Sequence, residues 1–262
     1  MDVYYFPNPE NDYVFHTIAS FDVFGDEDSV KAKTFMLGYS DTLYVSQNNI
    51  YISYQKNLPW KYYEDHNEQR FYDVIVPLLP SEVRSKINDV KNDGQSDSYE
   101  TWDMIADILE DMYNKMDEDE KDEFISKAQD AISDYETKLE IERRKTVIQK
   151  IRIDKGDIEY VAKGEVPGNL LNQFSMDENE GNLRVATTME FYGRGIISMT
   201  ETMGAPVESK MIAPQSKYNM YNNVYVLDED METIGKLEGL APDERIYSTR
   251  FLGDRLYMVT FK

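Results

Sequence analysis

The sequence predicts a mainly β fold that is built from a repeated set of short strands and interrupted by a helical insertion. Two observations support this prediction. Near both ends of the chain, apolar and polar residues alternate in short runs, which is the period of a half-buried strand. Between about residues 67 and 145, apolar residues instead recur every three or four positions, which is the period of an amphipathic helix.

Strands are expected where alternating runs are separated by turn residues. Three such turns are the segments 47–49, 179–182 and 253–254, since Asn, Asp and Gly tolerate tight and left-handed backbone. The predicted strands are Thr17–Val23, Lys31–Met36, Thr42–Val45, Ile50–Tyr54, Val147–Ile153, Ile158–Glu165, Leu170–Ser175, Leu183–Thr187, Val224–Leu227, Thr233–Leu237, Ile246–Phe251 and Leu256–Phe261.

An acidic segment, Asp177–Glu180, lies directly before Gly181. It occupies the same place between two strands as the turns at 47–49 and 253–254. We therefore interpret it as a solvated hairpin turn and not as a pair of catalytic carboxylates.

The strands form a repeat with two interruptions. Thr17 aligns with Val147 once the segment 58–145 is set aside, and Leu183 aligns with Leu256 once the segment 189–221 is set aside. The aligned positions are then separated by about 40 to 45 residues, which for four antiparallel strands is the period of a β-propeller blade. The predicted organisation is a first propeller segment at 1–57, a helical insertion at 58–145, and further blades at 146–262 with a loop insertion at 189–221.

The first insertion is acidic and helical. It holds 24 acidic and 12 basic residues, so it carries more than half of the net charge of the chain. Asp117 followed by Glu120 is a helix start signal, and it separates two apolar stripes. We expect these two helices to form an antiparallel hairpin, preceded by shorter helices near Glu68–Val76 and Ser81–Asn92. The stripes consist of Trp102, Ile105, Ala106, Leu109, Met112, Tyr113 and Met116, and of Phe124, Ala128, Ile132, Tyr135 and Leu139.

Two strings, "PGNLLNQFSMDE" and "ERIYSTRFLGDRLYMVTF", carry a resemblance to a known family. From about residue 12 to 262 the chain resembles the secreted β-propeller family of archaea and bacteria that is distantly related to WD repeats. The resemblance implies an extracellular or cell-surface protein and supplies no catalytic residue. It also implies further blades after Phe261. We therefore expect a fragment that lacks a signal sequence, with terminal half-blades at Asp12–Met36 and Arg245–Phe261 that self-associate more strongly as salt screens their repulsion.

Composition excludes several classes of function. The formal charge of −22 repels nucleic acid and anionic membrane surfaces. No apolar run approaches the length of a membrane span, so the chain as given is expected to be soluble. There is no cysteine, and the two histidines, His16 and His66, are too few for a histidine-rich metal site. Both are interpreted as ordinary structural or surface residues.

Two sets of residues are candidates for binding. Asp89, Asp93, Asp97 and Glu100 occupy positions 1, 5, 9 and 12 of a calcium-binding loop pattern, but Lys91 stands at position 3, where a ligand oxygen belongs. The alternative is a polar loop between two helices. Trp60, Tyr62 and Tyr63 form an aromatic segment that is a candidate contact for a partner.

These observations favour a non-catalytic binding or scaffold protein. The expected partner is a protein or glycan at the cell surface, since the chain offers no nucleophile with an adjacent base. Two alternatives stay open. One is a hydrolase whose carboxylates converge only in the complete propeller, and the other is a surface protein that binds calcium weakly. No cofactor other than calcium is a candidate.

Overall fold

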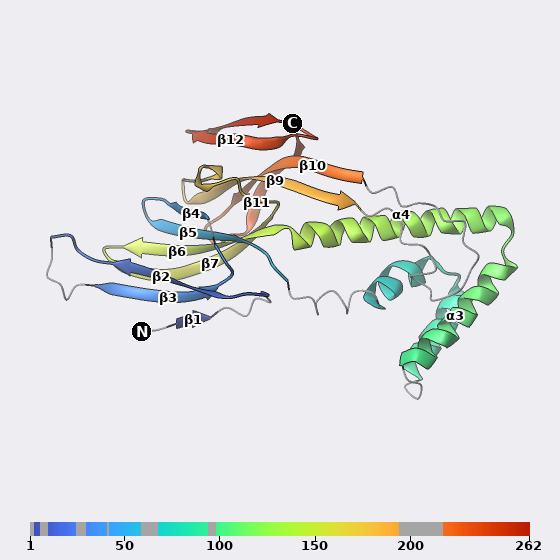
Figure 1. Cartoon of the computed structure of the whole chain (residues 1–262). Helices are drawn as coiled ribbons and strands as arrows, with labels where there is room; N and C mark the ends of the chain where they lie inside the picture. Colours follow the sequence, from blue (N-terminus) through green and yellow to red (C-terminus); the bar gives the residue numbers. More distant parts are fainter. Residues whose placement is uncertain are drawn as a thin grey trace. The chain divides into compact units, whose positions relative to one another are not determined.

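The computed structural model describes residues 3–5, 10–24, 30–40, 42–58, 68–93, 98–193 and 217–262. The fold is mainly β with a set of helices (Figure 1). The chain divides into two compact units, which are treated separately below. The sheet unit consists of Met1–Trp60, Glu140–Phe191 and Tyr218–Lys262, and the helical unit consists of Lys61–Leu139 and Tyr192–Lys217.

Two four-stranded sheets form the centre of the sheet unit, as expected for consecutive propeller blades. In both, the strands lie side by side in chain order, which is the meander of a blade. We call them the first and the second full sheet. The first contains β4 (Thr42–Val45), β5 (Asn49–Gln55), β6 (Lys145–Asp154) and β7 (Asp157–Pro167). The second contains β8 (Met176–Asn179), β9 (Asn182–Gly193), β10 (Lys217–Leu227) and β11 (Thr233–Leu240).

The two ends of the chain form smaller sheets. β12 (Arg245–Leu252) and β13 (Arg255–Phe261) make a two-stranded antiparallel sheet. β2 (Val14–Ser20) and β3 (Lys31–Leu37) make an antiparallel pair. Each full sheet therefore combines the last two strands of one sequence repeat with the first two of the next, which leaves the pairs β2–β3 and β12–β13 at the two ends of the chain. One strand was not predicted: β1 (Val3–Tyr5) pairs in parallel with β3, so the sheets are not all purely antiparallel.

The predicted strand at Leu170–Ser175 is wrong. Its second half is a short 3-10 helix, η4 (Gln173–Ser175), which also shows that helical turns are not confined to residues 67–145. The physical reason is the side chain of Asn172, which accepts a hydrogen bond from the backbone N–H of Phe174 at 2.9 Å and turns the chain out of the extended conformation. The strand that pairs with β9 begins only at Met176.

Strands β9 and β10 are longer than predicted. β9 continues to Gly193 and β10 begins at Lys217, although only Leu183–Thr187 and Val224–Leu227 were expected. Met189 and Phe191 are buried on β9, so the apolar pattern continues where the sequence suggested a loop. The residues from 194 to 216 lie outside the described part of the chain.

The first full sheet is covered by apolar side chains on both faces. On β5, Tyr51 packs in the cluster that joins the two full sheets, while Ile52 packs in the cluster toward β3. On β6, Ile148 packs in the cluster that joins the two full sheets, and Val147 packs in the cluster toward β3. Successive side chains of a strand point to opposite faces, so both faces of this sheet are buried.

The two end sheets expose apolar side chains. Phe15 on β2 is 65% exposed, and Tyr247 on β12 is 63% exposed. Three residues of β13 are more than half exposed, namely Tyr257, Val259 and Phe261. Among the described residues, no further sheet packs against the outer faces of these end sheets, so their apolar side chains stay exposed.

The helical unit contains three long helices, α2 (Ser81–Asn92), α3 (Ser98–Lys115) and the first part of α4 (Glu118–Arg143). A short π-helical turn, η2 (Phe71–Ile75), and a 3-10 turn, η3 (Val76–Leu78), precede them. The predicted helix start is confirmed: the Asp117 side chain accepts from the Glu120 N–H at 2.8 Å, and the Glu120 side chain accepts from the Asp117 N–H at 3.1 Å.

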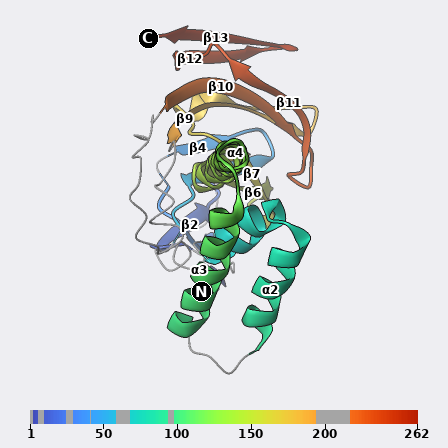
Figure 2. The same ribbon diagram turned by 90° about the vertical axis from the view of Figure 1, so that its right-hand side faces the viewer.

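The helical hairpin is formed by a different pair of helices from the expected one. Figure 2 shows α3 lying beside α2, the helix before it in the chain, whereas α4 turns away from α3. α4 adds Phe124, Ala128 and Ile132 to the core that α2 and α3 share. The apolar stripes were correctly placed, but periodicity gives no information on which stripes face each other.

The close approach of the two full sheets gives a testable prediction. A Cβ added to Gly164 on β7 would lie 2.6 Å from Cδ2 of Leu227 and 2.9 Å from the carbonyl oxygen of Met231. We expect Gly164→Ala to lower the free energy of unfolding by about 1–3 kcal/mol through overpacking. Gly235→Ala is the matched control, because its nearest neighbour would be Val226 at 3.7 Å. Urea unfolding followed by circular dichroism measures both, and equal stability of the two variants would contradict the prediction.

Candidate functional site

Both insertions leave the sheets at equivalent connections. The helical insertion joins β5 to β6, and the segment from 194 to 216 joins β9 to β10, so each lies between the second and third strand of its sheet. The ends of β5 and β9 lie on the same side of the sheets (Figure 1). We call this side the insertion end. Loops that share one end of a repeated scaffold are common binding surfaces, so this end is the first place to examine.

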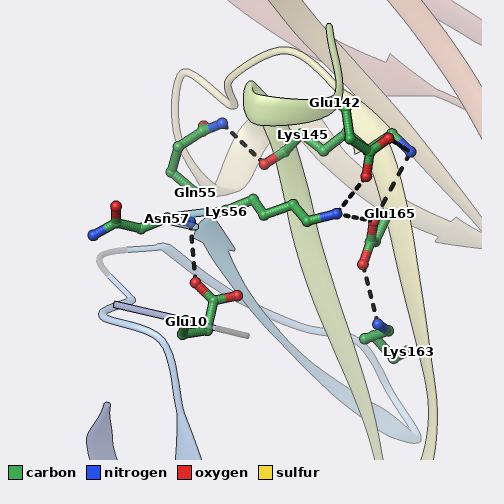
Figure 3. Close-up of polar contacts among 8 residues, drawn as sticks. All are labelled: Glu10, Gln55, Lys56, Asn57, Glu142, Lys145, Lys163 and Glu165. Atoms are coloured by element: carbon green, nitrogen blue, oxygen red, sulfur yellow. Dashed lines mark hydrogen bonds and ion pairs between the residues drawn. The ribbon is translucent and has the colours of Figure 1, made fainter. Parts of the chain in front are cut away.

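A cluster of charged residues lies at the base of the helical insertion (Figure 3). Lys56 follows β5 and is only 12% exposed, and its Nζ lies 2.5 Å from Glu142 Oε1 and 3.1 Å from Glu165 Oε2. Lys145 also pairs with Glu142, at 2.5 Å, and Lys163 pairs with Glu165, at 3.0 Å. We call these five residues the neck cluster. It links the residues before the insertion to the residues after it.

Opposite charges hold the neck cluster ionised. Burial alone would lower the pKa of Lys56, but hydrogen bonds to Glu142 and Glu165 outweigh it and raise that pKa above its usual value. Burial would raise the pKa of both glutamates, but their lysine partners keep it below its usual value. Each carboxylate of the neck cluster is paired with a lysine of the same cluster. This geometry fits an attachment that holds the two ends of the insertion together.

Backbone hydrogen bonds complete this attachment. The N–H of Lys56 donates to the carbonyl of Lys145 at 2.9 Å, which brings the two ends of the insertion together. The N–H of Asn57 donates to the carboxylate of Glu10 at 3.0 Å. Glu10 is only 6% exposed, and burial raises the pKa of its carboxyl group above the usual value. The N-terminal segment is thus attached to the same place.

A second polar cluster lies between the two full sheets. The carboxylate of Glu178 on β8 accepts hydrogen bonds from Ser46 Oγ at 2.6 Å, Asn49 Nδ2 at 2.9 Å and the Tyr51 hydroxyl at 2.8 Å. Its backbone N–H donates to the Tyr44 hydroxyl at 3.0 Å. We call these five residues the Glu178 cluster. It joins β8 to the hairpin of β4 and β5.

The interpretation of the acidic segment as a solvated turn is only partly right. The turn itself is confirmed, since Glu180 and Gly181 have φ of 53° and 82° and Asn179 pairs with Asn182 across them. Glu178 is different, because it lies in the strand and is half-buried. Burial would raise its pKa, but the hydrogen bonds it accepts lower the pKa below its usual value. Asn49 is a polar residue at the start of the largely apolar strand β5, which is a signal in the sequence. Glu178 stands between the polar residues Asp177 and Asn179 of β8, so nothing in the sequence distinguishes it.

A pocket of about 440 Å³ opens beside the Glu178 cluster. It lies where the first strands of three successive sheets come together, which in a propeller is the side of the central channel. The guanidinium of Arg250 lies over the Phe174 ring at 4.1 Å, and that of Arg184 lies over the Phe251 ring at 5.0 Å and pairs with Asp177. The residues that line this pocket are Leu43, Tyr44, Val45, Gln173, Phe174, Met176, Asp177, Arg250 and Phe251. Aromatic rings and paired charges therefore border this pocket.

The predicted binding residues are only partly described. Trp60, Tyr62 and Tyr63 lie outside the described residues, as does Asp97 of the calcium pattern. Asp89 lies near the end of α2, and Glu100 lies in the first turn of α3. In the described ranges, no three side chains of His, Asp or Glu are grouped as metal ligands. Asp93 and the rest of the calcium pattern therefore stay a prediction.

Two further residues bear on the sequence interpretation. Lys91, which stands where a calcium ligand belongs, lies with its Nζ over the Tyr72 ring at 3.5 Å. His16 has its Nε2 at 3.1 Å from the carbonyl oxygen of Gly38, which fits a structural role. Among the helices of the described part of the chain, none has a long enough apolar stretch to cross a lipid bilayer.

Comparison with known proteins places the chain among propellers. The family model described as "Beta propeller domain" matches residues 1–262. An uncharacterized protein of Methanocaldococcus jannaschii is 31% identical over 229 residues, which is 86% of this chain and 32% of that protein. An uncharacterized protein of Archaeoglobus fulgidus is 31% identical over 222 residues, which is 84% of this chain and 30% of that protein. The chain thus spans about a third of the length of these curated relatives. No solved structure matches it.

The Glu178 cluster predicts a loss of stability in acid. The pKa of Glu178 is lower in the folded chain than its usual value of 4.5, so its stabilisation is fully present above pH 4.5 and is lost as pH falls through the folded pKa. At pH 7 we expect Glu178→Gln to lower the free energy of unfolding by about 1–3 kcal/mol, since the amide leaves hydrogen-bond donors unpaired.

Glu180→Gln is the matched control, because Glu180 is exposed in the adjacent turn and loses the same charge. Urea unfolding at pH 7 and below pH 4 measures both variants. The difference between Glu178→Gln and wild type should shrink in acid, and a difference that is the same at both pH values would contradict the assignment.

Glu10 predicts the opposite dependence on pH. Its folded pKa is raised above 4.5, so its contribution to stability is fully present below pH 4.5 and is lost as pH rises through the folded pKa. Glu10→Gln keeps an oxygen for the Asn57 N–H without a buried charge. We expect this variant to melt at a higher temperature than wild type at pH 7 and at the same temperature at pH 4.

Glu10→Ala removes the acceptor as well and should be less stable than Glu10→Gln at both pH values. Thermal unfolding of the three proteins at pH 4 and pH 7 decides the matter. If Glu10→Gln were the less stable protein at pH 7, the charge of Glu10 would be stabilising and our account of its burial would be wrong.

Proposed function

The chain belongs to the beta propeller domain family, and from this premise we propose that it is a non-catalytic scaffold that holds its acidic helical insertion for binding a protein partner. The propeller sheets supply the attachment, and the insertion supplies the binding surface. The proposal includes an extracellular or cell-surface location, which follows from the resemblance of the sequence to a secreted family.

One observation carries this proposal, and it is the neck cluster. Lys56 is buried between Glu142 and Glu165, so the chain has an ion-paired attachment where the insertion begins and ends. A buried charge that loses its partners is costly, so this arrangement resists separation of the two ends. Such an attachment supports a role for the insertion beyond that of a tolerated surface loop.

The charge of the insertion supports a protein partner. The segment 58–145 carries 24 of the 50 acidic residues of the chain but only 12 of its 28 basic residues. A field of one sign speeds the encounter with a partner of opposite charge. A glycan partner has less support, because its candidate contacts Trp60, Tyr62 and Tyr63 lie outside the described residues.

A hydrolase completed by other parts of a longer protein has less support. Lysines or hydrogen-bond donors lower the pKa of Glu142, Glu165 and Glu178, which disfavours them as the general acid that glycoside hydrolysis needs. Glu10 has a raised pKa but is almost fully buried, so no substrate reaches it in this structure. Weak calcium binding by the acidic surface is compatible with the scaffold and is a secondary part of the proposal.

Self-association is a further part of the proposal. The end sheets expose aromatic side chains, including Phe15 on β2 and Tyr247 on β12. Such faces pack against other sheets, whether in the same protein or in a second copy. With a formal charge of −22, two copies repel each other, so association should strengthen with salt.

Affinity capture tests the binding function. The full chain, immobilised, should retain a defined protein from the cell-surface fraction of the source organism. The triple variant Asp107→Lys, Glu110→Lys, Asp130→Lys should retain about tenfold less, since three exposed charges of the insertion are reversed. The control triple Asp230→Lys, Glu232→Lys, Asp254→Lys makes the same charge change on the sheet unit.

The scaffold proposal fails if both triple variants retain as much protein as wild type. It also fails if the chain retains no protein and hydrolyses glycoside or ester substrates instead. Sedimentation of the chain at low and high salt separates binding of a partner from self-association. A monomer at both salt concentrations would remove the self-association part alone.

A further inference from the structure

The helical unit contains a groove of about 630 Å³ between α2, α3 and the start of α4. Its floor is apolar. Leu78, Val83, Ile108 and Met116 are partly exposed in it, and Met112 and Phe124 lie buried at its base. The volume is typical of a specific binding pocket, although the groove is open along its length.

The lining residues follow helical spacing on all three helices. α2 contributes residues 82, 83 and 86, and α3 contributes three pairs at 107 and 108, 111 and 112, and 115 and 116. α4 contributes residues 120, 123, 124 and 127. One face of each helix therefore borders the groove, over about one turn of α2 and about two turns of α3 and of α4. An apolar groove that is bordered by helix faces in this way fits the apolar face of another helix, with anchors spaced i, i+3, i+4 and i+7.

The rim of the groove is acidic after its own ion pairs are formed. Lys86 pairs with Glu82 at 2.8 Å, and Lys115 pairs with Asp111 at 2.6 Å. The third rim lysine, Lys127, pairs with Glu123 at 2.5 Å. All rim lysines are thus already matched by rim carboxylates.

Two more rim carboxylates belong to Asp107 and Glu120. Glu120 accepts a hydrogen bond from the backbone N–H of Asp117, which leaves its negative charge in place. The rim therefore has a net negative charge, and the whole insertion has a strong negative charge around it. A basic occupant is the complement of such a rim.

We propose that this groove binds a basic amphipathic helix of the partner protein, with apolar anchors on the floor and lysine or arginine side chains at the rim. This inference rests on the scaffold function proposed above and names the class of its partner. A second copy of the chain is disfavoured as the occupant, because its insertion is itself acidic and would place carboxylate against carboxylate.

A synthetic peptide tests the inference directly. The probe is an amphipathic peptide of about 14 residues, with leucine at positions i, i+3, i+4 and i+7 and lysine elsewhere, titrated into the full chain by calorimetry. We expect one binding site per chain. A peptide of the same composition in scrambled order should bind about tenfold more weakly or without fixed stoichiometry, since it has the charge but no apolar face.

Matched variants locate the site. Asp107 and Asp103 are both exposed on α3, but only Asp107 borders the groove. Asp107→Lys should weaken peptide binding about fivefold, while Asp103→Lys, with the same charge change on another face, should leave it nearly unchanged. Met116→Gln should also weaken binding by removing an apolar contact of the floor, and circular dichroism checks that the variants stay folded.

The outcomes separate this inference from the function on which it rests. If the scrambled peptide binds equally well, or if Asp107→Lys and Asp103→Lys behave alike, the groove is not the site and the inference is overturned. Loss of protein capture by the triple variant would in that case still support the scaffold. If neither capture nor peptide binding occurs, both proposals fall together.

Discussion

The structure depends on burial of both faces of the first full sheet. Tyr51 and Ile52 are neighbours in the chain, yet they belong to the cores on opposite faces of that sheet. This constraint keeps β5 and β6 paired although the long segment from 56 to 144 separates them in the sequence. Both strands contribute to both cores, so opening this pair would expose apolar area on two faces at once. The neck cluster lies at the end of this pair.

The polar clusters follow from the same arrangement. Glu178 reaches Ser46, Asn49 and Tyr51 only because the second full sheet packs against the first. Lys56 is buried because β7 brings Glu165 beside it. A buried charge is tolerated only where its partners are fixed, so these residues depend on the sheets around them and in turn specify how the sheets are joined.

The connections between strands are where insertions are added to this fold. Both insertions lie between the second and third strand of a full sheet, so they extend a sheet without breaking its order. Among the described residues, the helical insertion has an apolar core of its own, from Phe71 to Ile132. An element with its own core is free to evolve a surface of its own, and here that surface is an acidic groove.

The sequence by itself determined the class of the fold, the strand repeat with its two interruptions and the helix start at Asp117, because these depend on local periodicity and turn or capping chemistry. It also located the antiparallel strand pairs near the two ends of the chain. Only the tertiary structure decided that β1 pairs with β3, that α3 lies beside α2, and that Asn172 ends the expected strand before Met176. It alone brought together Lys56 with Glu142, and Glu178 with Asn49, which are 86 and 129 residues apart. Such contacts depend on how sheets pack, and a period of two or 3.6 residues specifies which face of an element is apolar but not which element will cover it.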